Sequence, residues 1–260
     1  METLDNLELP ELPEFCYMWA SGALASDNFI YYMPRTARRI MRLNPDNDSL
    51  SSVGDDLEGG EFKYLGTVVG NDDCVYGIPY NAKRIIKFDP TNPDTTCTVG
   101  EESEEQFKYH NGVLASDGYI YAVKESGKVL LQIDSTRSRY TTTWIGDRIN
   151  VGNGRAGWGD PIVGIDKCIY WPPSYANRVL KFDPETQQLP LLVGGILREE
   201  RWRTWQVGAR GIDGVIYCIP SYPNKVLVID PFKEISMTLQ NNFRQYYPQE
   251  LGRLFAKDEE

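Results

Sequence analysis

Short apolar runs separated by polar turns recur along most of the 260-residue chain. Five copies of one pattern can be aligned, and in each copy an acidic or amide residue stands 13 positions after a tyrosine. The tyrosines are Tyr31, Tyr76, Tyr121, Tyr170 and Tyr217, and their partners are Asn44, Asp89, Asp134, Asp183 and Asp230. The tyrosines are 45, 45, 49 and 47 residues apart. A period of this length predicts a repeat architecture in which each copy forms one structural unit.

Each copy contains four short strand candidates. In the second copy they cover residues 67–70, 74–79, 84–88 and 95–99. Asp-Gly and Asp-Asn steps between the first two strands favour the positive φ of tight hairpins, and most third strands end at a proline, which has no N–H for a ladder. Four strands in roughly 47 residues make one propeller blade. We therefore predict an all-β fold, a five-bladed β-propeller of four-stranded antiparallel blades. Six blades with one degenerate blade is the alternative.

The repeats also predict how the chain is divided. Residues 1–18 form an N-terminal extension, residues 19–247 the propeller, and residues 248–260 a C-terminal tail. The five blades lie near residues 19–63, 64–108, 109–157, 158–204 and 205–247.

The run VIYCIPSYPNKVLVIDP at residues 215–231 resembles the blades of YVTN-type and NHL- or Kelch-like β-propeller repeat proteins. The resemblance extends over about residues 19–247. It implies the fold but not the function, because propellers include enzymes, lectins and scaffolds. The Trp-Asp dipeptide of WD repeats and the double glycine of true Kelch blades are absent, so no subfamily is assigned.

Composition narrows the class of function. Lys and Arg number 27 and Asp and Glu 37, so the net charge of −10 argues against nucleic-acid binding. No apolar run approaches the roughly 18 residues of a membrane helix, and the acidic start does not resemble a secretory signal. The five cysteines are widely spaced and include no CxxC pair, which indicates buried free thiols in a reducing compartment. We predict an intracellular, most simply cytoplasmic, protein.

The candidates for catalysis are few. His110 is the only histidine, so a histidine-based metal centre is not expected, and we predict neither metal nor cofactor. The repeated tyrosines should pack between blades, and the repeated aspartates should hold turns. Asp160 is the one acid that replaces a small residue near the start of an innermost strand. It is therefore the weak catalytic candidate.

Cations recur in the loop between the second and third strands of each copy. They are Arg35, Arg38, Arg39, Lys83, Arg84, Lys128, Arg178 and Lys225. In propellers these loops share a face with the connections between blades, and that face usually carries the ligand. A ring of such cations, with Arg39, Arg84, Lys128, Arg178 and Lys225 as its members, would attract a phosphate, a carboxylate or an acidic peptide. The structural alternative is that each cation pairs with a carboxylate close by.

The connections between blades place aromatics beside cations, as in Phe62-Lys63-Tyr64 and Phe107-Lys108-Tyr109. One aromatic per copy should be a packing plug between blades. Trp202 is extra to the repeat, and with Arg203 it has the composition of an interface hot spot. The sequence thus favours a non-catalytic propeller that acts as a protein-interaction or scaffold module, with a protein partner or an acidic ligand. The alternatives are a lectin-like or small-anion binder and a propeller hydrolase or lactonase. The oligomeric state is left open.

Overall fold

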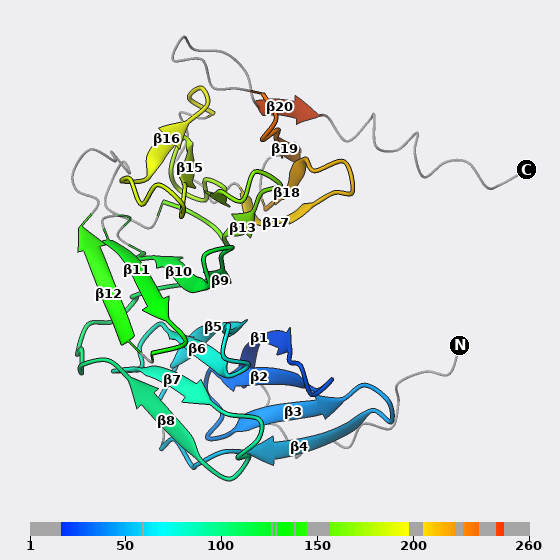
Figure 1. Ribbon diagram of the computed structural model, residues 1–260, viewed down its shortest axis with the longest axis vertical. Coiled ribbons are helices and arrows are strands. Elements are labelled where there is room, and N and C mark those ends of the chain that lie inside the picture. The colour runs from blue at the N-terminus through cyan, green and yellow to red at the C-terminus, as the bar shows by residue number, and fades with distance from the viewer. Residues whose placement is uncertain are drawn as a thin grey trace, which may run out of the picture. The chain divides into compact units, whose positions relative to one another are not determined.

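The computed structural model describes residues 17–58, 60–125, 127, 129–137, 139–144, 157–197, 205–221, 226–233 and 243–246. In these ranges the chain forms five four-stranded antiparallel sheets and no helix, as can be followed in Figure 1. No helix that could cross a membrane is therefore found in the described part of the chain. Each sheet is one blade with its strands in sequence order, so the prediction of an all-β, five-bladed β-propeller is confirmed.

The strands follow the repeat. In the first blade they are β1 (Trp19–Leu24), β2 (Ile30–Pro34), β3 (Ile40–Asn44) and β4 (Ser49–Val53). In the second they are β5 (Tyr64–Val69), β6 (Val75–Pro79), β7 (Ile85–Phe88) and β8 (Thr96–Val99). In the third they are β9 (Val113–Leu114), β10 (Tyr119–Val123), β11 (Val129–Asp134) and β12 (Arg139–Trp144). In the fourth they are β13 (Ile162–Val163), β14 (Ile169–Trp171), β15 (Val179–Phe182) and β16 (Leu191–Val193). In the fifth they are β17 (Trp205–Arg210), β18 (Ile216–Pro220), β19 (Val226–Ile229) and β20 (Phe243–Tyr246).

A tight turn joins the first two strands of every blade. One residue of each turn has a left-handed backbone, at equivalent positions and with φ between 60° and 84°. These residues are Asn28, Asp73, Gly118, Lys167 and Gly214. The expectation that Asp-Asn and Asp-Gly steps provide this conformation is confirmed for the first, third and fifth blades.

The chain divides into two compact units. The first contains β1–β8 and most of the third blade, and the second contains β13–β20. In the first unit, Tyr31 and Met33 of one blade pack with Tyr64 and Ile86 of the next. The same unit has a further core cluster that includes Tyr76, Ile78, Ile120 and Leu131.

In the second unit, Tyr170 of the fourth blade packs with Trp205, Ile216 and Leu227 of the fifth. The predicted packing of tyrosines between blades is therefore confirmed for Tyr31, Tyr76 and Tyr170, and Tyr121 is buried as well. The fifth blade differs, because the Tyr217 side chain is 41% exposed and Ile219 is 66% exposed. The equivalents of Ile219 in the first two blades, Met33 and Ile78, are buried.

The aromatic plugs predicted at the start of each innermost strand are also present. Tyr64, Tyr109, Trp158 and Trp205 are buried. The indole of Trp158 donates to the carbonyl oxygen of Arg178 at 2.9 Å, and the half-buried Trp19 donates equivalently to the carbonyl of Arg39 at 3.1 Å. The plug thus holds the loop between the second and third strands of its own blade.

The described cysteines are free thiols, and Cys74, Cys168 and Cys218 are buried as predicted. Burial raises the pKa of Cys74 to about 12, that of Cys168 to about 11 and that of Cys218 to about 12. These thiols therefore stay protonated near neutral pH, which makes them poor nucleophiles.

Candidate functional site

An aromatic rim lies on the loops of the first unit that join second to third strands and one blade to the next. Its members are Tyr17, Arg35, Phe62, Tyr80, Phe107 and His110. They come from the segment before β1, the loops after β2 and β6, and the connections that lead into β5 and β9. We call this set the aromatic rim.

The first half of the aromatic rim is a stack on Arg35. The guanidinium carbon of Arg35 lies 4.6 Å from the ring centroid of Tyr17 and 4.3 Å from that of Phe62. The backbone holds this stack in place, because the Arg35 amide donates to the Met18 carbonyl and the Arg35 carbonyl accepts from the amide of Lys63. Cation–π contacts with two rings restrict the position of the guanidinium.

The second half of the aromatic rim centres on Tyr80. Its ring contacts Phe107 at 5.4 Å and His110 at 5.3 Å between centroids, both edge to face. The two halves are connected through the backbone, since the amide of Asn81 donates to the Phe62 carbonyl at 3.0 Å. The Asn81 side chain in turn accepts from the Phe107 amide at 3.0 Å.

The Phe-Lys-Tyr triplets explain why these rings face outward. Phe62 and Phe107 both have a left-handed backbone with φ of 54°. A bulky residue rarely adopts this conformation, which costs about 1 kcal/mol or more. In this backbone conformation the phenylalanine side chain points toward the surface, whereas the lysine and tyrosine that follow point into the protein. Phe107 is 57% exposed.

The lysines of these triplets are buried, and their ammonium groups donate to carbonyl oxygens of the loops. The ammonium of Lys63 donates to the carbonyls of Ala37 at 2.8 Å and Gly60 at 3.3 Å. Lys108 donates to the carbonyl of Glu105 at 2.6 Å. Burial lowers the pKa of Lys63, and the charge of Arg38 acts in the same direction.

Three of the cations in the loops between second and third strands are paired, and one of them, Arg84, is a member of the predicted binding ring. Arg38 lies 2.7 Å from Asp56, Lys83 lies 2.7 Å from Glu104, and Arg84 lies 3.6 Å from Glu102. The acids come from the connections that follow β4 and β8. The structural alternative from the sequence therefore holds for these three side chains, and their positive charge is balanced locally.

The remaining candidates are distributed over both units. Arg39 is exposed in the first unit, whereas Arg178 is half-buried in the second. Asp160 is also half-buried in the second unit, and its amide donates to the carbonyl of Gln206 at 2.6 Å. Lys128, Lys225, Trp202 and Arg203 lie outside the described residues. The binding and catalytic roles of all these residues stay predictions.

Repeated carboxylates on the hairpin turns have the structural role that the sequence suggested. Asp27, Asp166 and Asp213 each accept the hydroxyl of the tyrosine four residues later at 2.6–2.7 Å. In the second blade the acceptor is Asp72, at 3.0 Å from Tyr76, and the neighbouring Asp73 supplies the left-handed turn position instead.

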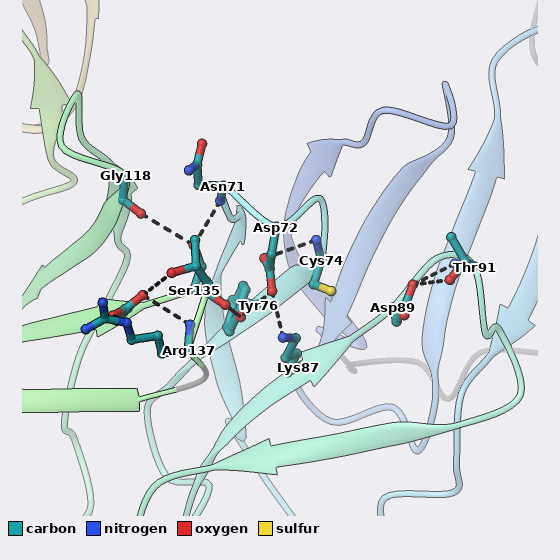
Figure 2. A network of polar contacts seen from close by, with 12 residues as sticks. Asn71, Asp72, Cys74, Tyr76, Lys87, Asp89, Thr91, Gly118, Ser135 and Arg137 are labelled. Carbon is teal, nitrogen blue, oxygen red and sulfur yellow. Dashed lines mark hydrogen bonds and ion pairs between the residues drawn. The ribbon is translucent and has the colours of Figure 1, made fainter.

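In two blades a lysine completes the aspartate–tyrosine pair. Lys87 lies 2.6 Å from Asp72, and Lys181 lies 2.9 Å from Asp166 (Figure 2 shows the first). Burial alone would raise the pKa of Asp166, but hydrogen bonds from Lys181 and Tyr170 outweigh it and the pKa is lowered. Each of the two carboxylates is thus engaged by a lysine, a tyrosine hydroxyl and a backbone amide, so we assign them no catalytic role.

Ser135 extends the same network from the second blade to the third. It replaces the proline found at Pro45, Pro90, Pro184 and Pro231 in the other copies. Its hydroxyl accepts from the amide of Asn71 at 3.0 Å, and its carbonyl accepts from the Tyr76 hydroxyl at 3.1 Å (Figure 2).

The third copy has Lys124 where the other copies have a proline three residues after the repeated tyrosine, at Pro34, Pro79, Pro173 and Pro220. The Lys124 amide donates to the carbonyl of Val129 at 2.8 Å, a ladder bond that proline cannot make. Within the described ranges no three His, Cys, Asp or Glu side chains are grouped so as to hold a metal ion.

Comparisons with known proteins place the fold. A scan against protein-family models finds no match, and neither does a comparison with curated proteins. A catalytically inactive variant of virginiamycin B lyase from Staphylococcus aureus, solved with quinupristin, matches at a TM-score of 0.68 and 12% identity, over 92% of this chain and 73% of that one.

Two further solved structures are similar. An auxiliary nutrient binding protein from Bacteroides thetaiotaomicron matches at a TM-score of 0.57 and 11% identity, over 88% of this chain and 56% of that one. A putative gluconolactonase matches at a TM-score of 0.56 and 11% identity, over 82% of this chain and 75% of that one. At these identities the likeness shows the fold alone. The chain is a β-propeller repeat protein, and the YVTN, NHL or Kelch-like subtype stays a prediction.

Proposed function

We propose that this propeller is a non-catalytic binding module whose aromatic rim receives a ligand or partner. One observation carries the proposal. The exposed rings of Tyr17 and Phe107 are held in place by the contact with Arg35, the left-handed backbone of Phe107 and the buried lysines. The binding surface is therefore formed before a ligand arrives. Aromatic and arginine side chains of this kind dominate the energetics of binding surfaces. The basic ring is not needed for this proposal, because the aromatic rim contains none of its members.

The test is affinity purification of the tagged full chain from extract of its source cells, followed by mass spectrometry of bound proteins and small molecules. The rim variant carries Tyr17→Ser and Phe107→Ser, at side chains 70% and 57% exposed. A matched control carries Leu191→Ser and Ile196→Ser, which are 62% and 63% exposed in the second unit. We expect the rim variant to lose bound material by about tenfold or more, and the control to keep it. Equal recovery from the rim variant and the wild type would contradict the proposal.

The second candidate is an enzyme that acts on a small ligand at the aromatic rim. It is favoured by the position of His110, the only imidazole of the chain, against the ring of Tyr80. Imidazole is the commonest general acid or base near neutral pH. Two of the similar propellers are a lyase and a putative gluconolactonase, which agrees with this candidate.

His110→Ala separates the two candidates once a ligand has been recovered. If the module is non-catalytic, the variant and the wild type should return the same unmodified ligand after incubation. Conversion of the ligand by the wild type but not by the variant would establish the enzyme.

A further inference from the structure

Arg35 is the described cation of the aromatic rim that no carboxylate balances. Within the described residues, the neighbouring loop cations Arg38, Lys83 and Arg84 each lie within ion-pair distance of an acid, whereas Arg35 meets two aromatic rings. Its Nε is buried and has no hydrogen-bond partner among the described residues. No carboxylate of the described residues therefore balances the charge of this guanidinium, and Tyr17 and Phe62 lie against it.

The shape of this stack selects a kind of ligand. A guanidinium presents its N–H groups in one plane, and a carboxylate matches them with two parallel hydrogen bonds. The two rings lie against the Arg35 guanidinium and its Nε is buried, so a ligand would meet the N–H groups of the other two nitrogens. A planar carboxylate can lie in the plane, whereas the oxygens of a tetrahedral phosphate project to both sides.

The residues around the Arg35 guanidinium favour a ligand that has an apolar part. Tyr17 is 70% exposed and lies directly beside the guanidinium, so an apolar body attached to the carboxylate would cover exposed ring surface. Burial of that surface would add to the charge-assisted hydrogen bonds.

We propose that Arg35, held between Tyr17 and Phe62, binds the carboxylate of a ligand that carries an apolar or aromatic body. This inference rests on the proposed function of the aromatic rim and names the chemistry of its ligand. The carboxylate can belong to a small organic acid or to a peptide, and the test includes a probe for each.

The alternative role of Arg35 is purely structural, as a staple between the segment before β1 and the connection before β5. A matched control is available for this alternative. Arg42 on β3 also stacks on a ring, 4.6 Å from the centroid of Phe29, and donates to Ser51 at 3.1 Å. A generic effect of removing a ring-stacked arginine should appear equally in Arg42→Gln.

The experiment titrates the full chain with benzoate, acetate, inorganic phosphate, benzyl alcohol and a short peptide with a C-terminal phenylalanine. Binding is followed by the Nε–Hε NMR signal of Arg35, which is identified by its absence from Arg35→Lys, and by the backbone amide signals of Tyr17 and Phe62, which can also be followed in Arg35→Gln. We expect benzoate to bind with a dissociation constant on the order of 1 mM, more tightly than acetate or phosphate, while benzyl alcohol does not shift the signal. Arg35→Gln should weaken benzoate binding by about tenfold or more, whereas Arg42→Gln should leave it unchanged. The melting temperatures of both variants are compared with that of the wild type.

Tighter binding of the peptide than of benzoate identifies a chain terminus as the source of the carboxylate, and the reverse identifies a small acid. Benzoate that binds Arg35→Gln as tightly as the wild type, or that does not bind the wild type at all, overturns the inference. A third outcome separates the two proposals. If Arg35→Gln keeps the material that the wild type captures, while the Tyr17→Ser and Phe107→Ser variant loses it, the proposed function of the aromatic rim stands and the carboxylate site is overturned.

Discussion

Asp72→Ala should destabilise the second blade by about 3 kcal/mol, because it removes the carboxylate that balances the charge of a largely buried lysine. The side chains of Lys87 and Asp72 are 17% and 18% exposed and lie 2.6 Å apart. The same carboxylate accepts from the Tyr76 hydroxyl at 3.0 Å and from the Cys74 amide at 3.3 Å (Figure 2). Urea unfolding combined with hydrogen exchange of the β5–β7 amides measures the change.

Two variants serve as controls for Asp72→Ala. Asp213→Ala removes the same turn contact in the fifth blade, where Tyr217 is exposed and Val228 stands opposite in place of a lysine. Its cost should be clearly smaller than that of Asp72→Ala. The double variant Asp72→Leu and Lys87→Met removes both charges and should recover much of the stability lost by Asp72→Ala. A double variant as unstable as Asp72→Ala would show that the unpaired lysine is not the cause.

Ile78→Ala should lower the free energy of unfolding by about 2–4 kcal/mol, because the deleted side chain leaves a cavity between two blades. Ile78 is fully buried and packs in a cluster with Ile120 and Leu131. Thermal and urea unfolding, followed by circular dichroism, give the change directly.

The matched substitution is Ile219→Ala, at the same repeat position of the fifth blade. Ile219 is 66% exposed, so we expect a change within about 0.5 kcal/mol. Equal costs for the two substitutions would mean that the Ile219 face is covered in solution.

The blades could be predicted from the sequence because their signals are local. The tyrosine and the acid 13 residues later mark the second strand and the end of the third, and turn residues mark each hairpin. The innermost strand was predicted less well, since β5 begins at Tyr64 rather than residue 67. A bulge between Tyr64 and Gly66 interrupts the alternation there, and composition does not reveal a bulge.

The site was less predictable because its contacts join loops that are distant in sequence. The cations near the third strands were found, but their pairing with acids after the fourth strands depends on loop geometry. In the sequence, Arg35 is one of eight cations in the loops before the third strands. The repeated Phe-Lys-Tyr triplet was visible, but nothing in it shows that the phenylalanine turns outward while the lysine turns in.

The left-handed backbone at Phe62 and Phe107 has a consequence for the kinetics of binding. Because these rings and the Arg35 stack are set before a ligand arrives, association need not wait for a loop to rearrange. Related ligands should then reach the surface at similar rates, and differences in their affinity should appear in how long each one stays bound.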